Sequence, residues 1–174
     1  DYLSGVGNRE RLATEVRSAA SARAIAARNL VLVTAQADKD MELAAVKSSF
    51  ERMTAGIAQL KKAIDDDATS TARDRELVEK IQSIEAKYGP VATGIVELAV
   101  AGNREEAIAR IDTDCRPLLA QLVGATGEYI AYNRQLADAS AARARADFET
   151  QRARLILGCV VPARLALAPG VVVG

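Results

Sequence analysis

Two arginines in an otherwise apolar segment are the side chains best suited to bind a ligand. The segment SARAIAARNLVLVT, residues 21–34, carries Arg23 and Arg28 among alanines and aliphatic side chains. Arg23 continues the three-and-four spacing of Leu12 and Val16, so it lies on the apolar seam of a helix. A guanidinium binds a carboxylate through two parallel hydrogen bonds. Because a buried charge without a partner is costly, Arg23 predicts an anion nearby.

The source of that anion has two interpretations. Arg23 and Arg28 lie about 140° apart around a helix, so they can share one ligand only if a second copy of the chain contributes one of them. The first hypothesis is therefore a dicarboxylate or tricarboxylate bridged across a dimer interface. In the alternative, both arginines pair with Asp or Glu of neighbouring helices or reach solvent.

The composition excludes several classes of site. The chain has no histidine, which removes most zinc sites and histidine-activated nucleophiles. Cys115 and Cys159 do not form a metal-ligand spacing, and free buried thiols are favoured over a disulfide. The three aspartates of residues 65–67 lack the pattern of an EF-hand, so helix-end and solvation roles are expected. We therefore predict no metal, no cofactor and no enzymatic activity.

The charge balance argues against a nucleic-acid partner. Lysine plus arginine and aspartate plus glutamate each total 23, which leaves a formal charge of zero. A nucleic-acid binder needs a basic face that displaces counterions. Aromatic residues make up only 3 %, so base-stacking platforms are also scarce.

Helical periodicity extends along nearly the whole chain. Four helices are predicted over residues 9–35, 40–64, 72–101 and 103–157. Short turns between them predict an all-α fold, an up-down-up-down four-helix bundle. The fourth helix is much longer than the others and leads toward an apolar segment that could begin a transmembrane helix.

The corner before the fourth helix carries the clearest end signals. Gly102 suits the position just after a helix, and Asn103 with Glu106 has the spacing of a capping box. Pro117 lies within the fourth helix, where a local bend is expected.

The last twenty residues are apolar apart from Arg164. We divide the chain into a bundle domain, residues 1–155, and a tail, residues 156–174. The tail is either the start of a transmembrane helix or a disordered or artificially appended segment. Since the chain begins at Asp1 without a methionine, we expect it to be a piece of a longer protein.

Three segments together resemble a known family. They are ARNLVLVTAQADKDMELAAVKSSFERM, LAVAGNREEAIARIDTDCRPLLAQL, and the long last helix with the apolar stretch after it. In this layout the chain resembles the periplasmic four-helix-bundle sensor domain of bacterial methyl-accepting chemotaxis receptors, the aspartate-receptor-like class. The resemblance implies a homodimer that binds amino acids or organic acids where the first helices of two subunits meet.

The resemblance also implies site residues. Arg28 matches the last of three arginines that clamp the ligand carboxylates, whereas Arg23 and Arg17 fall one and about two positions from the other two. The spacing differs from that of the family, so its amino-acid specificity is not carried over. On the fourth helix the pocket falls on DTDCRP, which makes Thr113 and Arg116 candidates. The tyrosine and glutamine that some members use there are absent.

Two functions follow from these observations. The first is a ligand-sensing domain in the periplasm, part of an inner-membrane chemoreceptor, that binds a small carboxylate as a homodimer and signals by displacing its fourth helix. Flanking segments would attach it to the membrane. The alternative is a structural or protein-interaction bundle without a small-molecule ligand, which predicts Arg23 and Arg28 in intramolecular ion pairs.

Overall fold

The computed structural model describes the backbone of residues 2–166 and the side chains of residues 5–156, and all its regular elements in this range are helices. The chain divides into two units, Asp1–Gln135 and Leu136–Gly174. The elements in chain order are α1 (Tyr2–Leu32), α2 (Gln36–Asp65), α3 (Ala72–Val100), α4 (Arg104–Arg110), the π-helical turn η1 (Ile111–Cys115) and α5 (Arg116–Ala166).

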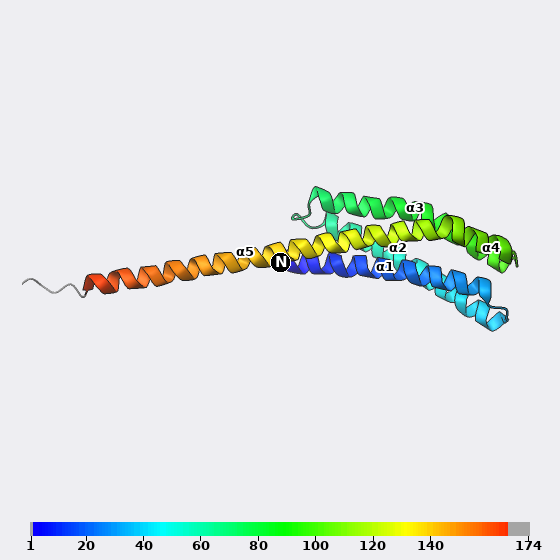
Figure 1. The fold of residues 1–174 in the computed structure, drawn as a ribbon, viewed down its shortest axis with the longest axis horizontal. Coiled ribbons are helices and arrows are strands. Elements are labelled where there is room, and N and C mark those ends of the chain that lie inside the picture. Colours follow the sequence, from blue (N-terminus) through cyan, green and yellow to red (C-terminus); the bar gives the residue numbers. More distant parts are fainter. Residues whose placement is uncertain (1, 167–174) are drawn as a thin grey trace, which may run out of the picture. The chain divides into compact units, whose positions relative to one another are not determined.

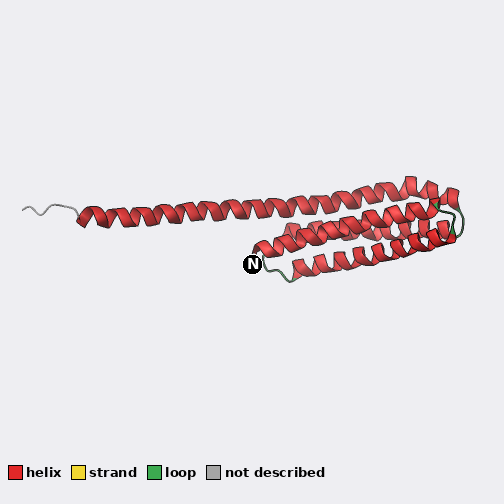
Figure 2. Cartoon of the chain, turned by 90° about the horizontal axis from the view of Figure 1, so that it is seen from below, coloured by secondary structure: helices red, strands yellow, loops and turns green. Residues whose placement is uncertain are grey.

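The first unit is a four-helix bundle, as predicted. Its four arms are α1, α2, α3, and the α4–η1–α5 segment as far as Gln135 (Figure 1). Successive arms run in opposite directions, and the α1–α2 and α3–α4 turns lie at the same end of the unit (Figure 2). The α2–α3 turn lies at the other end, beside the start of α1.

The seam of α1 has the predicted spacing. Its buried side chains recur three or four residues apart, and both Arg9 and Arg23 lie among them. They are mostly small, which allows α2 to approach closely. At Gly56 of α2, a Cβ atom would stand only 2.9 Å from the Cγ2 atom of Val16, so a larger residue there would force the two helices apart.

The start of α1 corrects the sequence prediction. The periodicity predicted a helix from Arg9, but α1 begins at Tyr2 and includes both Gly5 and Gly7. Val6 is fully buried, so packing of this first turn against the bundle outweighs the low helix propensity of the two glycines.

The helix ends are capped differently from the prediction. Gly102 follows α3 with a φ of +81°, and the N–H of Asn103 donates to the carbonyl of Leu98, which closes the helix as expected. The predicted capping box at Asn103 is wrong, because its side chain makes no cap hydrogen bond. The capping box is instead at the start of α3, between Thr71 and Asp74.

The irregularity predicted at Pro117 takes the form of a π-helical turn. Pro117 has no N–H, so the carbonyl four residues before it loses its usual partner. Directly before it, the N–H of Arg116 donates to the carbonyl of Ile111, five residues back. The turn therefore inserts one extra residue into the fourth arm at the level of Ile111–Cys115.

Of the second unit, the structure describes the remainder of α5, as far as Ala166. Its side chains from residue 141 to residue 156 are all exposed, including Phe148 and Leu155. Within the part of the chain that the structure describes, no helix combines the length and apolarity needed to span a membrane. Side chains of residues 157–174, most of the predicted transmembrane segment, lie outside the described residues.

Candidate functional site

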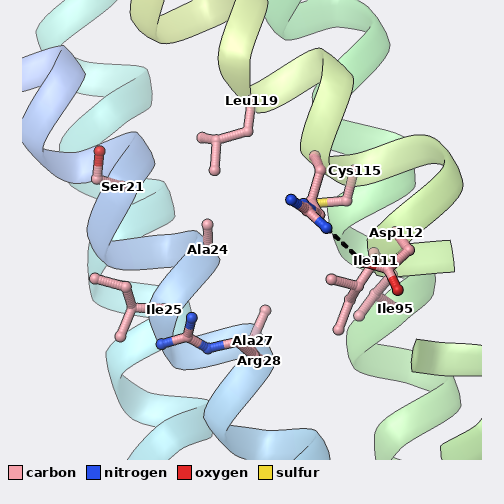
Figure 3. A pocket seen from close by; sticks show the side chains of 11 residues that line it. Ser21, Ala24, Ile25, Ala27, Arg28, Ile95, Ile111, Asp112, Cys115 and Leu119 are labelled. Atoms are coloured by element: carbon pink, nitrogen blue, oxygen red, sulfur yellow. Dashed lines mark hydrogen bonds and ion pairs between the residues drawn. The ribbon is translucent and has the colours of Figure 1, made fainter. Parts of the chain in front are cut away.

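A pocket of about 450 Å³ opens between α1 and the segment formed by η1 and the first turn of α5 (Figure 3). This volume lies within the range of small-molecule sites, about 300 to 1,000 Å³. Most of its walls are apolar. The aliphatic lining residues are Ala24, Ile25, Ala27, Ile95, Ile111 and Leu119. The alanines of α1 leave the space, because a larger side chain at these positions would occupy the gap between the helices.

Three charged side chains also line the pocket. The Nη1 atom of Arg116 lies 3.0 Å from the Oδ1 atom of Asp112, one helical turn away and exposed. Among the described residues the ion pairs include Arg116 and Arg23, but none involves Arg28. Two guanidiniums and one carboxylate leave the pocket with one net positive charge. Arg28 is thus an exposed cation at the edge of an apolar cavity, without an ion-pair partner among the described residues.

The π-helical turn shapes this pocket. Ile111, Asp112 and Cys115, three of its five residues, belong to the lining. A π turn widens the helix and changes the direction of the side chains, and such turns are frequent at functional sites. The sequence signal for it is Pro117, which marks the irregularity without revealing its form.

Cys115 contributes a buried, free thiol to the pocket wall. Burial raises the pKa of the Cys115 thiol. The group therefore stays neutral at physiological pH and lacks the thiolate character of a nucleophile. It acts as a small apolar surface in the pocket.

Arg23 lies elsewhere, inside the bundle. It is only 3 % exposed, and its Nη1 atom lies 3.5 Å from the Oε1 atom of Glu85 on α3. Its Nη2 atom donates to the Gly89 carbonyl at 3.3 Å and to the Thr93 hydroxyl at 3.2 Å. The guanidinium also stands 4.6 Å from the ring centroid of Phe50 on α2. The anion that the sequence required is therefore Glu85, as the alternative interpretation predicts.

The Arg23–Glu85 pair is incompletely satisfied. The Oε2 atom of Glu85 and the Nε atom of Arg23 are buried without a hydrogen-bond partner among the described residues. Burial raises the pKa of Glu85 to about 7, although the nearby Arg23 acts in the opposite direction. This carboxyl therefore titrates near neutral pH.

The remaining predicted residues lie outside the pocket. Arg17 is exposed on α1 and does not belong to the lining. Thr113 is exposed, and its hydroxyl donates to the Ala109 carbonyl at 3.0 Å. Of the five predicted site residues, the structure brings Arg28 and Arg116 to one pocket and places Arg23, Arg17 and Thr113 elsewhere.

A second buried arginine was missed. Arg9 is 1 % exposed, and its Nη1 atom lies 2.5 Å from the Oδ2 atom of Asp67 and 3.1 Å from the Ser70 hydroxyl. Its Nε atom lies 4.0 Å from the fully buried carboxylate of Asp74. Three-residue spacing from Leu12 to Arg9 is the signal that could have placed it on the seam. Asp67, assigned to a solvated turn, is instead an ion-pair partner.

The carboxylate of Asp74 joins three arms of the bundle. It accepts hydrogen bonds from the backbone N–H of Thr71 at 2.9 Å and from the Tyr129 hydroxyl of α5 at 3.3 Å. Together with Arg9 of α1, these contacts form a buried polar cluster beside the α2–α3 turn. Within the described residues, no group of three potential metal ligands is close enough to hold an ion.

The model of a protein family described as a four helix bundle sensory module for signal transduction matches residues 11–148. The match includes every residue that lines the pocket and, of the buried polar cluster, all the members except Arg9. No curated protein matches the chain.

Proposed function

The chain belongs to the family of four-helix-bundle sensory modules of methyl-accepting chemotaxis receptors, and on this basis we propose that it binds a small carboxylate in the pocket between α1 and α5. The unpartnered guanidinium of Arg28 carries the proposal. The Arg28 side chain is exposed, so the gain over bulk water comes from the apolar walls beside it, where water competes less for a bound carboxylate.

A second copy of the chain would cover the open side of the pocket. Ile25 and Leu32 are apolar yet more than half exposed, and they flank Arg28 at three-and-four spacing on α1. An exposed apolar stripe of this kind favours contact with another helix. We propose that α1 of a second subunit packs here, so that the ligand binds next to the dimer interface.

The signal would be a small displacement of the fourth arm. The pocket touches η1 and the first turn of α5 through Cys115, Arg116 and Leu119, and α5 then continues as one helix to Ala166. A ligand can shift this arm only by its differential affinity for two positions of the helix. Coupling free energies of this kind are typically about 1 to 3 kcal/mol.

The same proposal places the domain in the periplasm, as the sensory part of an inner-membrane receptor. Segments flanking the bundle would attach it to the membrane. Membership in a family of sensory modules supports this placement.

One observation favours the second candidate function, a structural or interaction bundle without a small ligand. The intramolecular Arg23–Glu85 pair is what that interpretation predicts for Arg23. Arg28 is exposed, as a scaffold also allows, so the two functions are distinguished by whether binding of a carboxylate requires Arg28.

The test is calorimetric titration of the chain with malate, citrate, aspartate and simple monocarboxylates, together with a thermal-shift screen. A ligand that binds the folded state raises the melting temperature by mass action. Arg28→Gln should abolish the binding, whereas Arg17→Gln, an exposed position on the same helix outside the pocket, should leave it unchanged. A flat screen with all these acids would favour the scaffold.

A further inference from the structure

The lining of the pocket indicates the class of ligand. On the premise of the proposed sensory function, we infer that the ligand is a monocarboxylate with an apolar body, and not a dicarboxylate or tricarboxylate. Three features of the pocket lead to this assignment. They are its net charge, its apolar lining, and the hydrogen bond that already occupies the Ser21 hydroxyl at the end away from Arg28.

The first feature is the charge. Arg28 is the guanidinium of the lining that has no ion pair among the described residues, because Arg116 already pairs with Asp112. One carboxylate neutralises the single net positive charge. A second carboxylate would meet the negative Asp112, and like charges in a half-apolar site repel each other.

The second feature is the wall. Ile111 and Leu119 face the cavity from η1 and α5 (Figure 3), and Ile25 of α1 and Ile95 of α3 line it as well. Apolar walls stabilise a ligand by removing its hydrocarbon surface from water, and they offer nothing to a second charged group. A hydrocarbon body attached to the carboxylate fits this surface.

The third feature is the end of the pocket away from Arg28. Ser21 lies seven residues before Arg28 on α1, about 10 Å along the helix. Its hydroxyl donates to the carbonyl of Arg17 at 3.0 Å, so its proton is already used. A carboxylate at this end would find no donor in Ser21, and it could bind Arg116 only in competition with Asp112. The carboxylate of the ligand therefore lies at Arg28, and its apolar part extends toward Ser21.

The experiment compares ligands of matched length by calorimetric titration of the 174-residue chain. Affinity should rise from acetate through butanoate to hexanoate by about fourfold for each methylene that becomes buried. Adipate, which has the six carbons of hexanoate and a second carboxylate, should bind at least tenfold more weakly than hexanoate. Hexan-1-ol, which lacks the charge, should also bind more weakly than hexanoate.

Variants separate the two parts of the ligand. Arg28→Gln should remove the preference for hexanoate over hexan-1-ol, and Arg17→Gln should retain it. Leu119→Ala should weaken hexanoate several-fold and leave acetate unchanged, because only the longer ligand reaches that wall. Circular dichroism and the melting temperature verify that each variant is folded.

The outcomes distinguish this inference from the proposed function. If adipate, malate or citrate binds more tightly than hexanoate and the binding requires Arg28, the ligand class is wrong while the sensory pocket stands. If neither group of acids binds, both proposals fail. Binding of hexanoate that is unchanged in Arg28→Gln would overturn the inference, because the carboxylate would then lie elsewhere.

Discussion

The two ends of the bundle use arginine in opposite ways. Beside the α2–α3 turn, Arg9 is sealed inside a polar cluster with Asp67 and Asp74. Near the opposite end, Arg28 stands at the rim of a cavity of about 450 Å³ with no internal carboxylate among the described residues. Both side chains belong to α1. The same helix is therefore fixed by internal charges at one end and open to an external charge at the other.

This difference shows where an external ligand can act. The buried ion pair between Arg9 of α1 and Asp74 of α3, which Tyr129 of α5 joins by a hydrogen bond, resists rearrangement, because separating it leaves a charge without compensation. A cavity lined by exchangeable apolar contacts has no such penalty. If the proposed ligand binds at Arg28, it would change the spacing between α1 and the fourth arm while the Arg9 cluster holds the other end in place.

Arg23 lies between these extremes. It is buried like Arg9, yet its ion pair with Glu85 is longer, 3.5 Å against 2.5 Å for Arg9 and Asp67. Since the Glu85 carboxyl also keeps one oxygen without a partner, this level of the bundle is held less firmly than the Arg9 end.

The largest effect on stability should come from breaking the buried polar cluster around Arg9. Arg9→Leu leaves Asp74 buried near an apolar group, and removal of one partner of a buried ion pair typically costs about 3 to 5 kcal/mol. We expect a loss of that size in the free energy of unfolding, measured by urea denaturation. Arg17→Leu, exposed on the same helix, should change it by less than about 0.5 kcal/mol. Equal stabilities of the two variants would contradict the assigned cluster.

The pH dependence of stability should distinguish the carboxyl partners of the two buried arginines, Glu85 beside Arg23 and Asp67 beside Arg9. The folded chain holds the Glu85 proton more tightly than the unfolded chain, because the pKa of Glu85 is raised to about 7. Its contribution is therefore complete below the ordinary pKa, about 4.3, and is lost as the pH rises through about 7. The expected loss is up to about 3 kcal/mol. Denaturation at a series of pH values measures this loss. The variant Glu85→Gln should not show the fall in stability between about pH 4 and 7.

Asp67 provides the matched control with the opposite sign. Hydrogen bonds from Thr69 and the charge of Arg9 lower the pKa of Asp67. Its contribution is present above the ordinary aspartate pKa and is lost as the pH falls through the lowered value. Asp67→Asn should therefore remove the fall in stability at acid pH and leave the fall that Glu85 causes toward neutral pH unchanged. A flat wild-type profile from pH 5 to 8 would show that Glu85 does not titrate as described.

A larger side chain in the cavity beside Arg28 should abolish ligand binding with a small effect on stability. Ala24→Leu places a larger side chain in the cavity, so we expect at least a tenfold loss of affinity for the carboxylate that binds best. The free energy of unfolding should change by less than about 1.5 kcal/mol, since the new side chain occupies existing space. Arg17→Leu serves as the control for both measurements. Undiminished binding to Ala24→Leu would place the ligand outside this pocket.

The smallest change in stability is expected for the exposed pair at the pocket. Asp112→Asn removes an exposed i,i+4 ion pair, which typically contributes less than about 0.5 kcal/mol. It also removes the carboxylate that repels a second negative charge. Adipate should therefore gain affinity relative to hexanoate, as calorimetric titration can measure. An unchanged ratio would mean that Asp112 does not face the ligand.

Much of the architecture could be predicted from periodicity. Four helical arms, their short turns and the position of Gly102 follow from local patterns, because helix propensity and three-and-four spacing depend on neighbours along the chain. The capping box at Thr71 also has a local signal, because Thr71 and Asp74 have the spacing of such a box. The start of α1 and the form of the π-helical turn did not follow, and packing of Val6 decides the first of these.

The sequence by itself determined that Arg23 lies on an apolar seam and needs an anion. Only the tertiary structure decided that the anion is Glu85, that Arg9 has Asp67, and that Arg28 has no internal partner among the described residues. The physical reason is that periodicity states which face of a helix turns inward, whereas an ion pair depends on which residues of other helices stand at the same level. That level is set by packing across the whole bundle.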